Sequence, residues 1–227
     1  MDRGELEQRE LIDLLDYAWS DLKLDGSALT REGVASIIHG DLVRNVSIAE
    51  SSEVRCHEKA MSAFRDLLYM QVDIDRASLQ QIAGAWDDFF DVSFRRVSPV
   101  LPHFGFTPPY HGDIPKLLDD LFRYASRAYE AEDVVAKAAR VHNGLVYIYP
   151  FAEHSEMIAR AAMQYVLLRA GKPIVDLGLT EQGYNTMTAD AIRGGDDGPL
   201  AGAIDLAVRK KEIAYGELSR PDPAYRL

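Results

Sequence analysis

The chain has 227 residues, one cysteine and a formal net charge of −11, from 36 acidic and 25 basic side chains. This length and an ordinary apolar share allow a sizeable core in one large or two small domains. The negative charge disfavours a nucleic-acid partner, which needs a basic patch. The lone Cys56 excludes an intramolecular disulfide and fits a reducing cytosol. Residues 1–5 are too polar for a signal peptide, and no apolar run reaches the roughly 20 residues of a membrane span. We therefore expect a cytoplasmic protein with no membrane partner.

Helical spacing of apolar residues governs the first ninety positions. Such spacing predicts a helix over about 11–22. Thr30 is expected to cap a second helix that Gly40 ends. The same pattern predicts further helices over 54–70 and 79–90.

The pattern changes after residue 91. Apolar residues at 92, 94, 97 and 100 alternate as in a short strand. Prolines at 99, 102, 108 and 109 then exclude a helix. We expect a β-hairpin within 92–106 and an extended loop after it.

Helical spacing returns at Pro115, which suits the first turn of a helix. Neither a repeat nor a long linker interrupts the chain, so we predict one domain over 1–227. Its fold class is all-α with a small β element. The remaining helices are expected at about 115–122, 132–148, 153–169, 180–193 and 200–218.

Residues 149–160 have the sequence Tyr-Pro-Phe-Ala-Glu-His-Ser-Glu-Met-Ile-Ala-Arg. The segment resembles the motif of the Fic/Fido (Fic-Doc) family, His-Pro-Phe-x-Asp/Glu-Gly-Asn-Gly-Arg-x-x-Arg. The motif is degenerate here, because Tyr149 replaces the family's histidine and residues 154–157 replace Gly-Asn-Gly-Arg. Four positions match at the family's spacing: Pro150, Phe151, Glu153 and Arg160.

Other segments resemble the same family in the same order. Residues 107–118 are similar to its flap-to-helix segment, within a flap at about 92–112. Residues 21–30 are similar to the inhibitory segment of members with an N-terminal inhibitory helix, here about 10–30. The resemblance covers about 10–215 and implies a Fic/Fido-like helical domain with a small β-hairpin flap.

The resemblance also implies roles for the matched positions. In members that transfer AMP, the histidine takes a proton from the target hydroxyl, and the acidic residue holds Mg²⁺ on the nucleotide. The glycine-rich helix start and the first arginine bind the phosphates. The second arginine holds the terminal phosphate or pairs with the inhibitory glutamate, whose position is Asp25 here. Tyr184 and Tyr110 stand where contacts with nucleotide and substrate are expected.

Tyr149 cannot simply replace a histidine base. A phenol with a pKa near 10 is ionised in about one molecule per thousand at pH 7, which costs roughly 4 kcal/mol. We expect Tyr149 to donate a hydrogen bond, to stack or to act as a nucleophile. The alternative is that it fills the histidine's space with its hydroxyl on backbone.

The substitutions after Glu153 oppose phosphate binding. A carboxylate about 4 Å from a phosphate repels it by roughly 4 kcal/mol at an effective dielectric near 20. A helix N-terminus offers only about 0.3–1 kcal/mol of attraction. If Glu156 faces the pocket, a triphosphate is rejected, and Met157 removes a cation in any case. Alternatively, Ser155 and Glu156 only stabilise the first helical turn.

Glu153 and Arg160 keep family identities in changed surroundings. Glu153 is the candidate metal position, so Mg²⁺ is a possible cofactor, and a cluster with His154 and Glu156 is the alternative. Arg160 can pair with Glu156 four residues earlier or with Asp25, although aspartate is shorter than the family's glutamate.

Three hypotheses follow. The first is an enzyme with non-AMPylating chemistry, such as group transfer or elimination on a small or phosphorylated substrate or on a protein. Its candidate catalytic residues are Tyr149, Glu153 and His154. Two different acid/base side chains close together would suit proton transfer. The second is a catalytically inactive regulatory or binding protein, and the third is residual protein AMP transfer.

Overall fold

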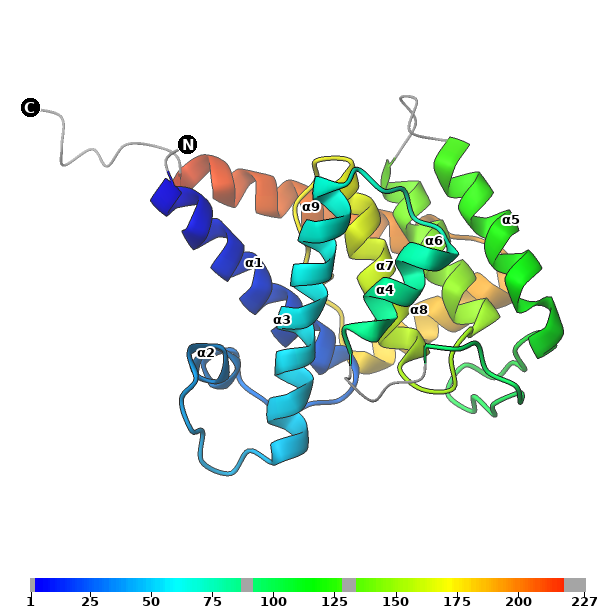
Figure 1. Cartoon of the computed structure of the whole chain (residues 1–227), viewed down its shortest axis with the longest axis horizontal. Helices are drawn as coiled ribbons and strands as arrows, with labels where there is room; N and C mark the ends of the chain where they lie inside the picture. The colour runs from blue at the N-terminus through cyan, green and yellow to red at the C-terminus, as the bar shows by residue number, and fades with distance from the viewer. Residues whose placement is uncertain (1–2, 87–91, 128–133, 219–227) are drawn as a thin grey trace, which may run out of the picture.

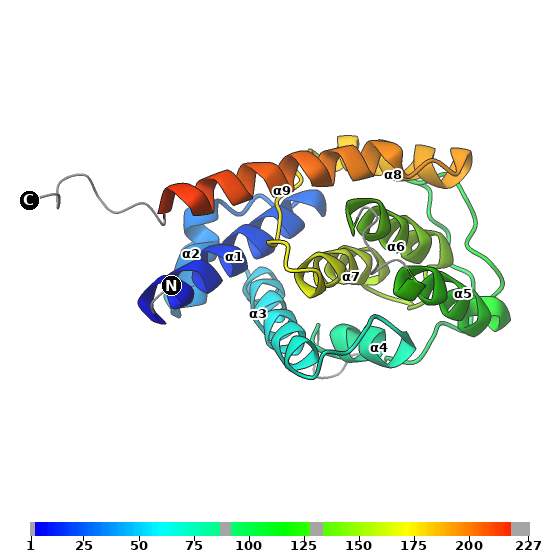
Figure 2. The same ribbon diagram turned by 90° about the horizontal axis from the view of Figure 1, so that it is seen from above.

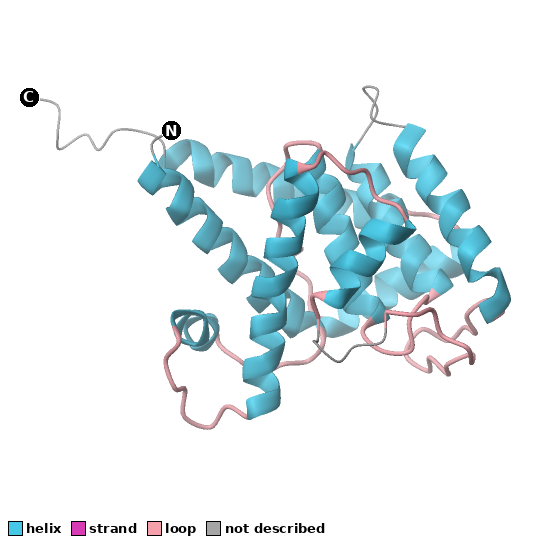
Figure 3. Ribbon diagram, viewed as in Figure 1, coloured by secondary structure: helices cyan, strands magenta, loops and turns pink. Residues whose placement is uncertain are grey.

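The computed structural model describes residues 3–86, 92–127 and 134–218. These residues fold into helices and loops, and no strand is present among them (Figure 3). The predicted all-α class is therefore confirmed. In chain order the helices are α1 (Arg3–Leu24), α2 (Arg31–His39), α3 (Ile48–Tyr69), α4 (Arg76–Gly84), the short 3₁₀ helix η1 (His111–Asp113), α5 (Ile114–Arg127), α6 (Val134–Ile148), α7 (Ser155–Arg169), α8 (Glu181–Gly194) and α9 (Gly198–Leu218).

Helix α7 lies at the centre of the bundle (Figures 1 and 2). It is buried along most of its length and packs most extensively against α6. α3 and α4 also contact α7, and α9 packs across α6 (Figure 2). A second, smaller apolar cluster joins α1, α2 and α3 around Leu22, Val34 and Val54. The loop between α6 and α7, residues 149–154, is thus held by the most deeply buried helix pair.

Local capping chemistry sets several helix boundaries. Thr30 caps α2 by accepting the Gly33 amide proton, and Gly40 ends α2 with a left-handed φ of 90°, as predicted. α3 begins six residues earlier than the periodicity indicated, because Ser47 and Glu50 form a capping box there. The helix predicted over 79–90 is α4, which begins at Arg76 and ends at Gly84. Residues 87–90 of the prediction lie outside the described part of the chain.

The predicted β-hairpin within 92–106 is wrong in its extent. The described residues of this segment form a single antiparallel bridge, between Leu101 and Phe106, and no paired strands. Pro99 and Pro102 lack the amide protons that a ladder requires. The segment is a tight turn in which the Phe104 and Gly105 amides both bond to the Leu101 carbonyl, at 3.2 and 3.1 Å.

No helix in the described ranges is both long enough and apolar enough to cross a lipid bilayer.

Candidate active site

The motif loop between α6 and α7 has an unusual backbone. Tyr149 and His154, at its two ends, have φ values of 48° and 56°. The left-handed region is uncommon for residues other than glycine and usually requires support from neighbouring structure. The predicted loop position of Tyr149 is confirmed, and the bonds around the loop provide this support.

Arg95 is the main support, and the sequence analysis did not identify it. Its side chain is almost fully buried, and its guanidinium donates to the carbonyls of Tyr149 (2.7 Å), Pro109 (2.6 Å) and Ile148 (3.2 Å). Its own amide bonds to the Pro150 carbonyl at 2.9 Å. Arg95 thus satisfies carbonyls at the C-terminus of α6 that have no partner within the helix.

Ser155 is a structural residue of the loop. Its hydroxyl accepts the Phe151 amide proton and donates to the Phe151 carbonyl, both at 2.9 Å. Both side chains are buried. The Ser155 hydroxyl, which was predicted to bind substrate, is therefore occupied by the Phe151 backbone. These two bonds join the loop to the start of α7.

Glu156 joins two proton-bearing groups at the start of α7. The Tyr149 hydroxyl donates to Glu156 Oε1 at 3.3 Å, and His103 Nε2 lies 2.9 Å from the same oxygen. Burial, followed by the charge of Glu156, raises the pKa of the Tyr149 phenol. Tyr149 therefore donates a hydrogen bond here, one of the roles expected of it from the sequence. Its hydroxyl bonds to a carboxylate rather than to backbone.

Arg160 does not pair with Glu156. It is buried on α7, with Nη2 2.5 Å from Asp25 Oδ2, and it forms a two-point contact with Asp21, the second bond of which is 3.3 Å long. Its Nη1 has no hydrogen-bond partner among the described residues. The guanidinium also lies 5.3 Å from the centre of the Tyr184 ring.

The two aspartates respond differently to Arg160. Burial opposes ionisation of Asp21, but Arg160 and a bond from His57 Nε2 at 3.0 Å outweigh it and lower the Asp21 pKa. Burial dominates at Asp25, whose side chain has fewer partners, and raises its pKa to about 6. Asp21 is thus the stronger partner of Arg160, whereas the sequence comparison pointed to Asp25.

Tyr184 begins a series of hydrogen-bonded polar side chains next to Arg160. Its hydroxyl is 2.9 Å from His142 Nε2, His142 Nδ1 is 2.9 Å from Asn143 Oδ1, and Asn143 donates to Asp197 at 2.8 Å. Burial lowers the His142 pKa to about 4, so its ring is neutral. His142 is thus a satisfied core histidine. Tyr184 is buried as well, and a ligand would have to displace this chain to reach its hydroxyl.

Three further site residues were predicted from the sequence. Glu153 is exposed, His154 is half-buried, and Tyr110 is exposed and packs on His111 with ring centres 4.3 Å apart. Within the part of the chain that the structure describes, no three histidine, cysteine or carboxylate side chains gather to hold a metal ion. At the predicted Mg²⁺ position, the exposed carboxylate of Glu153 therefore does not belong to a group of three such ligands among the described residues.

A cavity of about 230 Å³ adjoins the site where α1, α3 and α7 meet. Its lining includes three carboxylates, those of Asp25, Glu50 and Glu53, and the side chain of Met157. Met157 occupies the position that the resemblance assigns to a phosphate-binding arginine. The cavity is small and acidic, which disfavours a nucleotide triphosphate.

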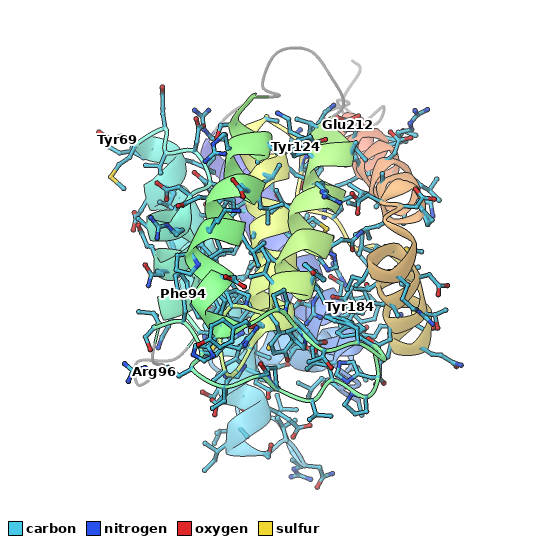
Figure 4. The ribbon with its side chains drawn as sticks, turned by 90° about the vertical axis from the view of Figure 1, so that its right-hand side faces the viewer. Tyr69, Phe94, Arg96, Tyr124, Tyr184 and Glu212 are labelled. Atoms are coloured by element: carbon cyan, nitrogen blue, oxygen red, sulfur yellow. The ribbon has the colours of Figure 1, made fainter. Side chains whose placement is uncertain are left out.

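Phe94, Arg96 and Tyr184 lie toward the end of the molecule that carries the motif loop, and Tyr69, Tyr124 and Glu212 lie toward the other end (Figure 4). The site is therefore built at one end of the helical bundle.

Comparison with known proteins agrees with this arrangement. The family model described as the Fic/DOC family matches residues 57–167, which include α6, the motif loop and most of α7. This match supports membership of the Fic/DOC family. Among curated proteins, the protein adenylyltransferase Fic of Drosophila melanogaster is 25% identical over 178 residues, and that of Drosophila ananassae is 27% identical over 158 residues.

These matches cover 76% and 67% of this chain but only 36% and 31% of the fly proteins. The chain therefore corresponds to about a third of the length of those Fic relatives. Among solved structures, Fic-1 (residues 134–508) of Caenorhabditis elegans superposes with a TM-score of 0.78 at 19% identity, over 96% of this chain and 67% of that one. A Fic family protein of Desulfovibrio desulfuricans superposes with a TM-score of 0.68 at 18% identity, over 92% and 67%. Both establish the shared helical fold.

Proposed function

We propose that this Fic-family protein is an enzyme whose chemistry does not use a nucleotide donor and whose substrate is an uncharged or cationic group of a small molecule or a protein. The single observation that carries the proposal is the position of Glu156. Its carboxylate stands at the start of α7, where the family pattern has a glycine, and both Tyr149 and His103 hold it there. This arrangement puts a negative charge where nucleotide phosphates would bind.

The magnitudes favour exclusion of ATP. Repulsion of roughly 4 kcal/mol between Glu156 and a phosphate about 4 Å away exceeds the attraction of a helix N-terminus, about 0.3–1 kcal/mol. Arg160 is already engaged by Asp21 and Asp25. Glu156 repels the phosphate of a phosphorylated substrate in the same way. We therefore expect the group of the substrate that reacts to be neutral or positively charged.

Isothermal titration calorimetry with ATP and Mg²⁺ tests the proposal. We expect no low-micromolar binding to the wild type. The double variant Glu156→Gly with Met157→Arg should bind ATP more tightly, because one change removes repulsion and the other adds a phosphate partner. Met157→Arg alone is the matched control, since it adds the cation while Glu156 remains. Low-micromolar affinity in the wild type would restore residual AMP transfer, the activity for which the fly relatives are named.

A catalytically inactive regulatory or binding protein is the second candidate, and the closure of Arg160 by two aspartates favours it. The two candidates differ in the effect of Tyr149→Phe. Small metabolites incubated with the wild type should be consumed only if the protein is an enzyme, and Tyr149→Phe should slow this consumption by about 10²-fold if the hydroxyl takes part in proton transfer. A binding protein should leave every metabolite unchanged.

A cytoplasmic location and the absence of nucleic-acid partners also belong to the proposal. The single cysteine and the net charge of −11 support them.

A further inference from the structure

His103 lies on the turn of residues 101–106, far in sequence from the motif. Phe104 anchors this turn in the core, where it is 1% exposed, and the bridge between Leu101 and Phe106 closes it. The His103 ring packs on Phe104 with ring centres 4.3 Å apart. A histidine on a turn fixed in this way is pre-positioned over the start of α7.

The contact with Glu156 sets the tautomer of His103. An ionised carboxylate only accepts hydrogen bonds, so the His103 nitrogen 2.9 Å from Glu156 Oε1, Nε2, carries the proton. In the neutral ring the other nitrogen, Nδ1, is then the basic atom. No hydrogen bond from Nδ1 to a described residue is present, and the His103 side chain is 39% exposed. The Glu156 side chain is less exposed, at 19%.

We infer that His103, oriented by Glu156, is the proton-accepting catalytic residue of this site and replaces the histidine lost at position 149. The inference rests on the proposed function and deepens it by identifying the base. A hydroxyl or ammonium group of the substrate gives its proton to Nδ1 while Nε2–H stays bonded to Glu156. The imidazolium that forms lies against a carboxylate, which stabilises it.

Chemical modification tests the inference without a known substrate. Diethyl pyrocarbonate modifies unprotonated imidazole nitrogen, and peptide mass spectrometry gives a rate for each histidine. His39 is the matched control within the chain: it is exposed, but its Nδ1 bonds to the neutral carbonyl of Ala35 at 2.7 Å. At pH 8 we expect His103 to react faster than His39, because the charge of Glu156 stabilises the positive charge that develops on the attacking imidazole more than a neutral carbonyl does.

Glu156→Gln removes the charge and keeps a hydrogen-bond acceptor. It should slow the modification of His103 by at least about twofold and leave that of His39 unchanged. An unchanged or faster His103 would overturn the inference.

The Glu156→Gln variant could also change the reactivity of His103 by moving the turn of residues 101–106. A ¹⁵N NMR measurement of the His103 ring in the wild type avoids this ambiguity, because it reports the tautomer directly. The Nε2–H tautomer of His103 at pH 8 is required, and an Nδ1–H tautomer would overturn the inference directly. Neither result depends on ATP. Failure here therefore leaves the nucleotide-independent function standing with another base, whereas tight ATP binding would remove that function and leave the oriented histidine.

Discussion

Arg160 forms buried ion pairs with Asp21 and Asp25. The guanidinium is buried between α1 and α7, and both carboxylates that face it come from the C-terminal end of α1 or the turn after it. A buried charge that loses its partner retains the cost of its burial. The same contact therefore neutralises the charge of the guanidinium and fastens α1 to the bundle.

Arg160→Ala should destabilise the fold by about 3–5 kcal/mol, because Asp21 would stay buried without its cation. Arg193→Ala is the matched control, since Arg193 pairs with Asp190 in solvent and its side chain is 61% exposed. The control should cost about 0–1 kcal/mol. Urea unfolding of both variants gives the comparison, and equal losses would show that the buried contact contributes no more than a surface pair.

Asp25 and Asp21 should give opposite pH dependences of stability. The Asp25 pKa is raised to about 6, so its contribution to the free energy of unfolding is fully present at pH values below its ordinary pKa, near 4, and is lost as the pH rises through 6. The lowered Asp21 pKa acts in the other direction and adds stability above pH 4. Unfolding curves between pH 4 and 7 should therefore show Asp25→Asn gaining on the wild type as the pH rises. A constant difference would contradict this.

The site could be located from the sequence, but its contacts could only partly be predicted. The motif resemblance placed Tyr149 in its loop and paired Arg160 with Asp25. It gave Asp21 too little weight, because aspartate replaces a serine there, although a carboxylate at that position is the better partner of a buried arginine. The bond between His103 and Glu156 joins residues 53 apart across an irregular turn, and no periodicity encodes such a contact.

Among the secondary-structure elements, helix caps were predictable where a capping residue directly precedes an apolar pattern, as at Thr30. The early start of α3 was missed, although Ser47 followed three residues later by Glu50 is a capping-box pattern that could have indicated it. The hairpin was predicted from alternation alone, and the prolines within it decided against paired strands.

Two helical glycines should respond oppositely to alanine. At Gly144 in α6 an added Cβ would lie 2.7 Å from a methyl carbon of Leu121, so α5 and α6 approach too closely for a methyl group. Gly144→Ala should destabilise by about 1–3 kcal/mol. At Gly202 in α9 an added Cβ meets nothing within 4 Å, and Gly202→Ala should stabilise by about 0.5–1 kcal/mol. Thermal melting of both variants tests this pair, and a stabilised Gly144→Ala would contradict the close approach.

For the molecule as a whole, the two ends of the described chain are linked. α1 and the C-terminal part of α9 lie side by side (Figures 1 and 2). Lys211 contacts Asp13 at 3.3 Å and also Asp16, and the Tyr215 hydroxyl donates to Asp13. α1 is therefore held at its C-terminal end by Arg160 and in its middle by α9, so it is an integrated part of the bundle.

Lys211→Met should loosen α1 selectively. It leaves Asp13 and Asp16 facing each other without the cation, at a cost of about 1–3 kcal/mol. Hydrogen exchange should then be faster in α1 amides and unchanged in α7. Lys116→Met is the control, because the ion pair of Lys116 is solvent-exposed. Equal exchange in α1 of both variants would show that α9 does not hold it.

The contact between α1 and α9 also orders events during synthesis. Lys211 follows Asp16 by 195 residues, so α1 is synthesised well before the helix that supplies this contact. Until then, α1 is held by its packing against α2 and α3 and by its contact with Arg160. We therefore expect α1 to reach its full stability only after α9 has been synthesised.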